Sequence, residues 1–399
     1  MINKIKTEAG KIYKEIVAIR RHLHKHPELS FHETATSAYI EKILKETGIP
    51  YHSGIAQHGI VAILEGKKKN KIGVKLKSVA LRTDMDALPI QEENKVEYKS
   101  VNNGVMHACG HDVHTASLLG VVKILKKFEK EFSGIVYFIF QPAEERVPGG
   151  AKEMLESSCF KKCKPDVILA QHVESALESG EVGFKSGTYM ASTDEIYITV
   201  KGKGGHAAMP HQNIDSILIA SHIIVALQQI VSRFSNPAIP SVLSFGKIIG
   251  NGATNVIPDE VKIEGTFRTT NEIWREDAHL KMKMMARSIA EGMGGHCEFR
   301  ILKGYPVLVN NPQVTEKAEL LAYEYLGKTK VKTLDLKMTA EDFAYFAQKF
   351  PSSFYRLGIK NERRNITSAI HTSTFNVDES SLKTGMGLMA WLAYAFIKE

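Results

Sequence analysis

The 399-residue sequence has few cysteines, and none of its apolar runs is long enough to cross a bilayer. Its four cysteines, Cys109, Cys159, Cys163 and Cys297, are too few for the disulfide framework of a small secreted protein. The longest apolar runs, such as residues 135–140, are far shorter than the roughly 20 residues of a transmembrane helix. The first 14 residues are polar and charged and lack the apolar core of a signal peptide. These absences predict a cytoplasmic protein with no membrane partner.

The sequence also lacks a concentrated basic patch. Lys and Arg outnumber Asp and Glu by 52 to 44, which gives a formal net charge of +8, but the basic residues are mixed with acids. One short basic run, residues 67–71, lies between two strand-like segments and is typical of a solvated loop. We therefore expect no nucleic-acid partner. The length allows two domains of roughly 100–200 residues each.

The two ends of the chain show alternating helix-like and strand-like patterns. Helical spacing of apolar residues occurs in residues 7–24, 33–46, 118–128, 152–163, 315–326, 340–349 and 381–396. Strand-like apolar runs occur in residues 60–64, 79–83, 135–140, 166–170 and 353–357. This alternation predicts an α/β domain in which helices cover a sheet.

The middle of the chain has a different order of elements. Strand, helix, strand, strand, helix and strand are expected in residues 195–200, 214–232, 241–248, 261–269, 271–291 and 296–302. This β-α-β-β-α-β order is that of a ferredoxin-like unit. We therefore predict a domain made of residues 1–185 and 303–399, with residues 186–302 inserted as a second domain.

Acidic residues and a histidine follow three of the predicted strands. Asp86 follows residues 79–83, Glu144 and Glu145 follow residues 135–140, and His172 follows residues 166–170. A single acid after a strand is usually a turn or cap residue. Three such strands indicate a site, because sites of open α/β sheets form at the carboxyl ends of the strands.

The densest group of metal-binding residue types is His107-Ala108-Cys109-Gly110-His111-Asp112-Val113-His114. Cys109 and His111 flank a glycine, so the loop can turn both side chains toward one point. Thiolate and imidazole suit zinc, and also manganese, cobalt or nickel. The alternative is a buried structural cysteine beside a hydrogen-bonded histidine. Asp112 is interpreted as a cap of the following helix, and His107 and His114 as supporting or packing residues.

The adjacent pair Glu144-Glu145 repels itself unless a cation or a proton intervenes. One carboxylate of such a pair can bind a metal while the other acts as a general base toward water. The alternative is a solvated acidic turn.

Further candidates come from the middle of the chain and from its end. Three glycines precede His206, which could donate a hydrogen bond to a developing oxyanion. Arg268 suits bidentate binding of a carboxylate, and Asn255 lies at a predicted loop. For His206 alone an incidental role is as good an interpretation, whereas Asn255 and Arg268 alone are more often structural. His371 by itself indicates little.

With these residues, the sequence resembles a known family, the dinuclear metallopeptidases of the aminoacylase and carboxypeptidase type. The resemblance is strongest to the branch of N-acyl-amino-acid amidohydrolases, hippurate hydrolases and auxin-conjugate hydrolases. It covers nearly the whole chain, and it rests on residues 20–29, 81–89, 107–114, 141–145, 204–208, 253–258, 340–343 and 371–372. The motif that contains Cys109 is specific to this branch.

The resemblance implies a zinc-peptidase-like α/β catalytic domain with an inserted ferredoxin-like lid that dimerises. It implies two divalent ions of zinc, manganese, cobalt or nickel. The ligands implied are Cys109, His111, Glu145, His172 and His371. Glu144 is implied as the base and Asp86 as a residue that orients the site, while His206, Asn255 and Arg268 would hold the substrate from the lid. In a dimer, His206 would reach the active site of the partner.

These expectations combine into one hypothesis, the metal-dependent hydrolysis of the amide bond of small N-acyl amino acids. A dipeptidase or carboxypeptidase would use the same residues, and a non-catalytic binding protein would have lost some of them. The sequence departs from the family at Arg146, where glycine is common, and at Val173-Glu174-Ser175, where proline often follows the histidine. Neither departure removes a ligand or the base.

Overall fold

The computed structural model describes residues 1–69 and 76–398, which form two compact units. The first unit comprises Met1–Gly187, Val309–Asp335 and Asp342–Glu399, and the second comprises Thr188–Leu308 and Leu336–Glu341. The chain passes into the second unit within β7 (Gly187–Met190) and returns within β14 (Leu308–Asn310). Of the predicted basic loop, residues 67–69 are exposed, and residues 70–71 lie outside the described part of the chain.

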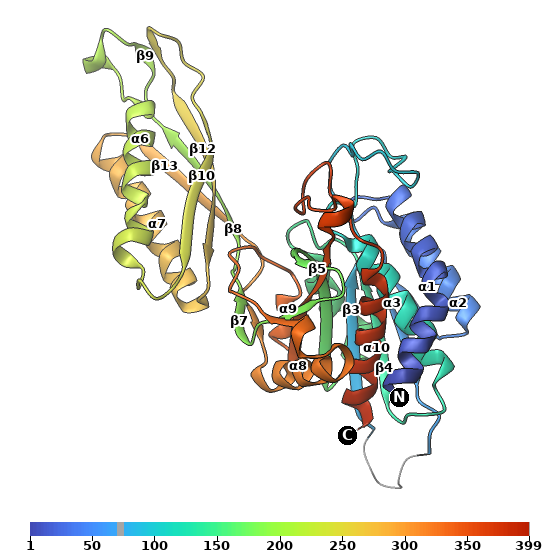
Figure 1. Cartoon of the computed structure of the whole chain (residues 1–399). Coiled ribbons are helices and arrows are strands. Elements are labelled where there is room, and N and C mark those ends of the chain that lie inside the picture. Colours follow the sequence, from blue (N-terminus) through green and yellow to red (C-terminus); the bar gives the residue numbers. More distant parts are fainter. Residues whose placement is uncertain (70–75, 399) are drawn as a thin grey trace. The chain divides into compact units, whose positions relative to one another are not determined.

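An eight-stranded sheet forms the centre of the first unit, in the order β1-β2-β4-β3-β5-β16-β6-β15 (Figure 1). Its strands are β1 (Tyr51–Ile55), β2 (Gly59–Glu65), β3 (Ser78–Asp84), β4 (Ile135–Gln141), β5 (Val167–Glu178), β6 (Val182–Phe184), β15 (Val331–Thr333) and β16 (Ser352–Lys360). The central strands β4, β3, β5 and β16 run parallel to one another. Their carboxyl ends therefore lie at the same edge of the sheet.

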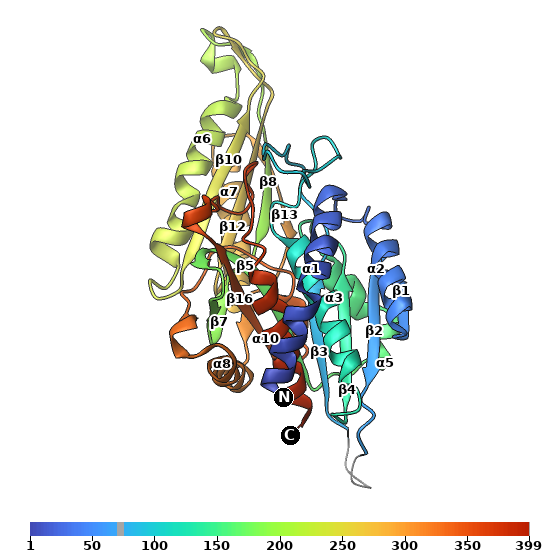
Figure 2. The same ribbon diagram turned by 45° about the vertical axis from the view of Figure 1, so that its right-hand side comes forward.

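One face of this sheet is covered by the long helices. These are α1 (Ile2–Lys25), α2 (Thr34–Thr47), α3 (His111–Lys127), α8 (Pro312–Leu326) and α10 (Ser381–Lys398). Figure 2 shows α1, α3 and α10 side by side along the strands. Side chains alternate along a strand, so Leu81, Phe138, Leu169 and Tyr355 point into this core. The residues between them point to the opposite face, which is also covered, so these strands are continuous apolar runs in the sequence.

The opposite face is covered by short helices, α4 (Gly150–Glu156), α5 (Ser158–Lys162) and α9 (Ala344–Ala347). Phe343 of this layer packs against Phe354 of β16, with ring centroids 5.4 Å apart. The single helix predicted over residues 152–163 is wrong, because the extended residue Ser157 interrupts it and caps α5 through a hydrogen bond from Phe160 N–H. The helix predicted over residues 340–349 is also wrong. Only Ala344–Ala347 are α-helical, and Pro351 disfavours helix immediately before it.

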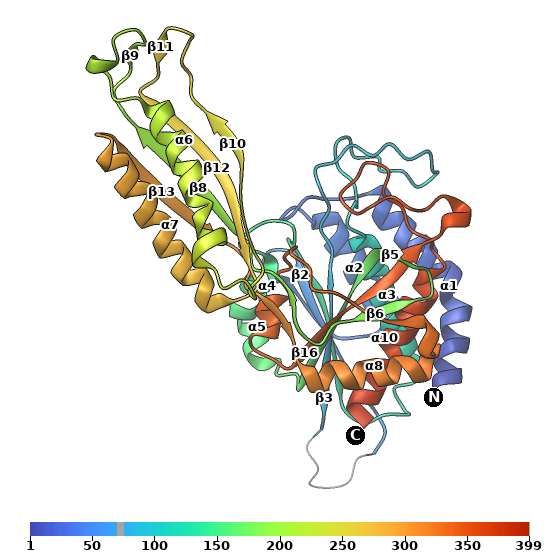
Figure 3. The ribbon, with the colours of Figure 1, turned by 60° about the vertical axis from the view of Figure 1, so that its left-hand side comes forward.

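The second unit is a four-stranded antiparallel sheet with two helices on one face (Figure 3). In chain order its main elements are β8 (Asp194–Lys201), α6 (Ser216–Leu227), β10 (Ser241–Ile249), β12 (Glu260–Thr269), α7 (Glu272–Gly292) and β13 (His296–Lys303). The sheet order β10-β12-β8-β13 is the ferredoxin-like order. Residues of β8 alternate between buried and half-buried, and Ile196, Ile198 and Val200 pack against the helices.

Helix α6 and the turn that follows it are unusually apolar. Among the described residues, Ser216–Phe234 form a stretch that is long and apolar enough to cross a membrane by length and composition. Ile219, Ile223 and Leu227 of this stretch lie in the core of the second unit. Leu218 and Val225 lie on the other side of the helix and are exposed.

Candidate active site

The parallel strands of the first unit bring most of the predicted site residues to one edge of the sheet. Asp84 ends β3, and Gln141, which ends β4, precedes the turn that carries Glu144 and Glu145. His172 was expected after its strand, but it lies within β5, because that strand continues to Glu178. His111 begins α3, one residue after the loop that carries Cys109.

The loop before α3 depends on Gly110. This residue has a φ of 82°, and a Cβ atom there would lie 2.6 Å from Cγ2 of Val173. Only glycine combines this left-handed conformation with so close an approach. Gly110 is also the N-cap of α3, with no side-chain cap, so the interpretation of Asp112 as the cap is wrong.

Asp112 instead belongs to a buried charge network beneath the site. Its Oδ2 lies 2.8 Å from Arg20 Nε and 2.7 Å from His24 Nδ1. Burial raises the pKa of Asp112, but Arg20 and His24 outweigh this effect and hold it below its usual range. The network ties α1 to the first turn of α3. His107 is also buried, and burial lowers its pKa to about 4.

Cys109 belongs to two of the candidate ligand groups. Its Sγ lies 3.3 Å from His172 Nε2 and 3.3 Å from His371 Nε2. Three groups made of predicted site residues have metal-ligand spacing: Cys109 with His111 and His172, Cys109 with Glu145 and His371, and His111 with Glu144 and Glu145. Within each group the ligand atoms lie within 4.8 Å of one another. The structure thus brings all five predicted ligands together with the predicted base.

Hydrogen bonds orient two of the candidate imidazoles toward this point. Asp86 Oδ1 lies 3.1 Å from His111 Nδ1, and Asp86 also accepts hydrogen bonds from Ser30 Oγ and from the Glu145 main chain. His172 Nδ1 lies 2.7 Å from the Val173 carbonyl, to which it donates. In both rings Nδ1 is engaged, so Nε2 is the atom that faces the other ligands. Asp86 and the Val173 carbonyl thus set the orientation of these two rings.

The charges at the site favour a cation. Burial alone lowers the pKa of His111, but Asp84, Asp86 and Glu145 outweigh it and raise that pKa to about 10. Burial and the carboxylates of Glu145, Glu144 and Asp84 raise the pKa of Cys109 well above its usual range. Both shifts reflect an excess of carboxylate charge around a thiol and an imidazole. A bound divalent cation would neutralise this charge.

The side chains fit divalent metal ions. The buried atoms His111 Nε2 and Glu145 Oε1 have no hydrogen-bond partner among the described residues, although buried polar atoms usually have one. Sulfur, imidazole nitrogen and carboxylate oxygen are the donors that zinc and related transition metals take. His371 has a φ of 62°, a conformation that is uncommon outside glycine, and its N–H donates to the Ala108 carbonyl at 2.8 Å. The main chain therefore holds this exposed ligand in place.

The turn that carries the candidate base is strained and held by buried carboxylates. Ala143 has a φ of 52°, and its N–H donates to Glu33 Oε1 at 2.7 Å. On the other side of Glu144, the N–H of Glu145 donates to Asp86 Oδ2 at 2.9 Å. Glu144 itself is buried, and its Oε1 accepts the N–H of Asp342 at 3.4 Å. The two flanking hydrogen bonds fix the direction in which Glu144 leaves the main chain.

The remaining predicted residues, His206, Asn255 and Arg268, lie in the second unit. His206 is exposed on the two-stranded sheet of β9 (Gly205–His206) and β11 (Val256–Ile257), and the N–H of Ala207 donates to the Asn255 carbonyl at 3.0 Å. His206 and Asn255 are therefore neighbours. Arg268 lies on β12, and its Nη1 donates to the Met338 carbonyl at 3.2 Å.

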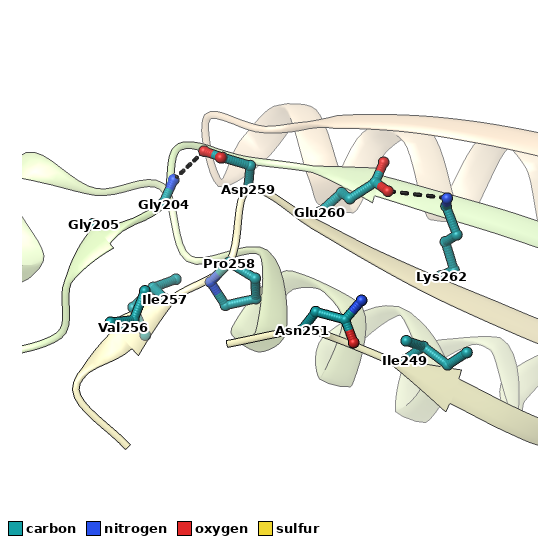
Figure 4. Close-up of a pocket in the computed structure, with 10 residues that line it drawn as sticks. All are labelled: Gly204, Gly205, Ile249, Asn251, Val256, Ile257, Pro258, Asp259, Glu260 and Lys262. Carbon is teal, nitrogen blue, oxygen red and sulfur yellow. Dashed lines mark hydrogen bonds and ion pairs between the residues drawn. The ribbon is translucent and has the colours of Figure 1, made fainter. Parts of the chain in front are cut away.

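The glycine-rich loop before His206 is held by neighbouring side chains. Figure 4 shows Asp259 Oδ1 accepting the N–H of Gly204, at 2.8 Å, beside a cavity of about 480 Å³. A Cβ atom on Gly205 would lie 2.2 Å from Oδ1 of Asn213, so glycine makes room here for a side chain of the same unit. The N–H of Ala208 donates to His206 Nδ1 at 3.1 Å, which leaves the hydrogen of a neutral ring on Nε2.

Several residues that support the site had no predicted role. Arg82 Nη2 donates to Asp342 Oδ1 at 2.8 Å, and Gln141 donates to both oxygens of Asp342. Asp342 lies in a segment that contributed to the family resemblance, but without a predicted role. Ser30 and Glu33 lie in the loop between α1 and α2, and the helical spacing of apolar residues does not indicate that these polar side chains turn inward.

Comparisons with known proteins agree with this geometry. The model of peptidase family M20/M25/M40 matches residues 80–395. Thermostable carboxypeptidase 2 of Saccharolobus solfataricus is 39% identical over 399 residues, with 99% of each chain covered. An N-acyl-L-amino acid amidohydrolase of Geobacillus stearothermophilus is 42% identical over 307 residues, which cover 77% of this chain and 81% of that one.

A solved structure extends the likeness to the whole fold. The dinuclear metal binding peptidase YXEP of Bacillus subtilis, described as a member of the M20 family, is 32% identical and has a TM-score of 0.81. The alignment covers 97% of this chain and 99% of that one. The predicted resemblance and fold class are thereby confirmed. The chain belongs to peptidase family M20/M25/M40, a family of metal-dependent hydrolases of amide bonds.

Proposed function

We propose that the protein hydrolyses the amide bond of small N-acyl amino acids and releases a carboxylate and a free amino acid. The observation that carries the proposal is the position of Cys109 Sγ, 3.3 Å from the Nε2 atoms of both His172 and His371. One thiolate shared by two ligand groups suits a pair of divalent cations, held with His111 and Glu145. Zinc, manganese, cobalt and nickel all accept this donor set.

When bound, the cations supply Lewis acidity that polarises the amide carbonyl and lowers the pKa of the attacking water. Glu144 takes a proton from that water and passes it to the nitrogen of the leaving amine. Its burial and its fixed turn support this role, because a general base must lie within hydrogen-bond reach of the proton. Asp86 keeps Nε2 of His111 directed at the ligand group.

The proposed substrate-binding residues His206, Asn255 and Arg268 lie in the second unit. His206 presents Nε2–H, since its Nδ1 accepts the N–H of Ala208, and it donates to the developing oxyanion. Arg268 and Asn255 bind the free carboxylate of the substrate, because a guanidinium group matches a carboxylate with two parallel hydrogen bonds.

The first test combines metal content with turnover. Purified protein is assayed for zinc, manganese, cobalt and nickel, and for release of amino acid from N-acetyl, N-benzoyl and N-succinyl amino acids before and after chelation. We expect about two ions per chain and turnover that chelation abolishes. Glu144→Gln should retain the metal and lose turnover by at least about 100-fold. A fully active Glu144→Gln would exclude the proposed base.

A dipeptidase or carboxypeptidase activity is the second candidate. It is favoured by the relative named thermostable carboxypeptidase 2, which matches over 99% of this chain. The same panel, extended with dipeptides and with N-blocked peptides that have a free carboxyl end, separates the two. Metal-dependent release from peptides without release from N-acyl amino acids would favour the second candidate.

The second unit also supports a homodimer. Strand β10 is at an edge of its sheet, and exposed edges pair readily with another strand. Exposed apolar side chains gather on β10 and α6, where Ile248 is 52% exposed, Leu218 48% and Val225 72%. A second copy of this chain could cover both with a two-fold interface. Light scattering of the wild type and of Val225→Glu should give a dimer and a monomer, respectively.

The cytoplasm is the compartment that suits the proposed centre. Cys109 can bind a cation only as a reduced thiolate, and reducing compartments keep thiols in this state. Localisation of the tagged protein by cell fractionation tests this part of the proposal.

A further inference from the structure

Val173 follows the candidate ligand His172 on β5, beyond the point where β3 pairs with that strand. A side chain holds the main chain of Val173 there. The pairing of these strands extends only to Arg82 opposite Ala170. Further along β5, the main-chain N–H of Val173 donates to His114 Nε2 at 2.8 Å. The carbonyl of the same residue accepts the Nδ1–H of His172 at 2.7 Å. A side chain therefore supplies the acceptor that this buried N–H requires.

The direction of these hydrogen bonds fixes the tautomer of His114. Because Nε2 accepts from an amide, it carries no hydrogen, and Nδ1 carries it instead. His114 Nδ1 lies 2.6 Å from Asp84 Oδ1, to which it donates. Asp84, His111 and His114 have metal-ligand spacing. Both nitrogens of His114 are engaged, however, so this ring has no lone pair left for a cation.

Asp84 is fixed in turn by Arg82. The Nη1 atom of Arg82 donates to Asp84 Oδ2 at 2.7 Å, and both side chains are fully buried. Arg82 Nε donates to Gln141 at 2.8 Å, and its Nη2 donates to Asp342 at 2.8 Å. The guanidinium group cannot turn away without breaking these bonds. Asp84 must therefore present Oδ2 to Arg82 and Oδ1 to His114.

We propose that Asp84 and His114 are positioning residues that orient His172 for cation binding by holding the peptide of Val173. The proposal rests on the proposed function, because it takes His172 as a ligand. With Nδ1 of His172 tied to the Val173 carbonyl, Nε2 faces Cys109 Sγ at 3.3 Å. If the Val173 peptide rotates, its carbonyl moves and His172 loses the partner that sets its ring orientation.

Two substitutions at His114 separate the hydrogen bonds that it makes. In His114→Gln, the amide oxygen reaches the place of Nε2 and still accepts the Val173 N–H. In His114→Asn, the shorter amide reaches the place of Nδ1 and still donates to Asp84, but Val173 loses its acceptor. We expect His114→Asn to weaken cation binding about 10- to 100-fold and His114→Gln to stay within about threefold of the wild type.

A third variant tests the proposal without changing His114. In Asp84→Asn, Arg82 must still face an oxygen, so the amide NH₂ group faces His114. His114 Nδ1 must then accept, which moves its hydrogen to Nε2, where it opposes the Val173 N–H. We expect a loss of cation affinity of about 10-fold or more despite the matched size.

The measurement is the affinity of the full-length protein for Mn²⁺ and Zn²⁺, by competition with a chromophoric chelator. The visible absorption of the Co²⁺-loaded protein, with its thiolate-to-cobalt band, reports the geometry around Cys109. Thermal unfolding verifies that each variant folds. Wild-type protein that binds no cation would overturn the proposed function. Wild-type protein that binds two, with His114→Asn and Asp84→Asn unchanged in affinity and spectrum, would overturn only the positioning role. Equal losses in His114→Asn and His114→Gln would also overturn it, since only the Asn variant removes the acceptor at Val173.

Discussion

Glu33 gives a stability prediction that can be worked out from its surroundings. Its side chain is fully buried, Oε1 accepts the N–H of Ala143, and Oε2 has no hydrogen-bond partner among the described residues. Burial, together with the nearby charge of Asp86, raises the pKa of Glu33 from 4.5 to about 7. The folded-state pKa lies above the unfolded value. The carboxyl therefore stabilises the fold fully only below about pH 4.5, and this contribution is lost as the pH rises through about 7.

The perturbation is Glu33→Gln, which keeps an acceptor for Ala143 but cannot ionise. One pKa unit corresponds to about 1.4 kcal/mol, so the full contribution of Glu33 is roughly 3 kcal/mol. Between pH 5 and pH 8 the wild type should lose about 2–3 kcal/mol that the variant keeps. We therefore expect Glu33→Gln to be close to the wild type at pH 5 and more stable at pH 8.

The assay is urea unfolding followed by tryptophan fluorescence. The chain has two tryptophans, Trp274 in the second unit and Trp391 in α10 of the first. In a Trp274→Phe background, Trp391 reports the unfolding of the first unit alone. Chelated protein is used, because a bound cation would add its own stabilisation. The matched control is Glu46→Gln, which changes an exposed residue of α2, the helix that Glu33 precedes. A Glu33→Gln effect that is equal at pH 5 and pH 8 would refute the reasoning.

Three further predictions concern the second unit, the loop before α3 and the shared thiol. Asp194→Ala should destabilise the second unit by about 3–5 kcal/mol in urea, because it leaves the guanidinium group of Arg275 buried without the carboxylate. Burial raises the pKa of Asp194, but hydrogen bonds from a histidine and from Arg275 outweigh it, so this stabilisation should be lost as the pH falls below about 4. Gly110→Ala should reduce both cation affinity and the free energy of unfolding. The loss of stability should exceed the roughly 1–2 kcal/mol that a left-handed backbone costs a residue with a Cβ atom, because the added Cβ also meets Val173. Cys109→Ser should weaken the binding of both cations in a chelator competition, because Sγ of Cys109 is shared by two ligand groups, one with His172 and one with His371.

The first two of these predictions have a matched control. Glu298→Gln breaks an exposed ion pair with Lys201 in the same unit as Asp194 and should leave its stability unchanged. Gly48→Ala has a similar φ, 65°, but no atom within 4 Å of the added Cβ, so it isolates the cost of backbone strain. Equal effects of Gly48→Ala and Gly110→Ala would show that the contact with Val173 is unimportant. Loss of one cation only in Cys109→Ser would contradict the sharing of the thiol.

Local patterns predicted the first unit well where one strong signal dominated. Residues 135–140 form a continuous apolar run, and they form β4 because both faces of that strand are covered by helices. The predictions failed where tertiary contacts competed with helical spacing. Asp342 accepts hydrogen bonds from Arg82 and Gln141, which lie far away in the sequence. The helix begins only after Asp342.

The candidate site shows the same division. Cys109, His111 and the Glu144-Glu145 pair carried a chemical signal, because metal-binding residue types lay close together in the chain. His371 carried almost none alone, since it lies 262 residues from Cys109. Ser30 and Glu33 were missed because a polar residue in a loop usually faces solvent, and only the packing of that loop against the site turns them inward.

The sequence by itself determined the family, the α/β and ferredoxin-like orders of elements, and the residue types of the candidate metal ligands. These properties follow from the spacing of apolar residues and from short motifs, which are local along the chain. Only the tertiary structure decided that one thiol lies 3.3 Å from two histidines, and that Asp84 and His114 hold the peptide beside one of them. Distances and hydrogen-bond directions between remote segments depend on how the strands pair and the helices pack, and no local pattern encodes them.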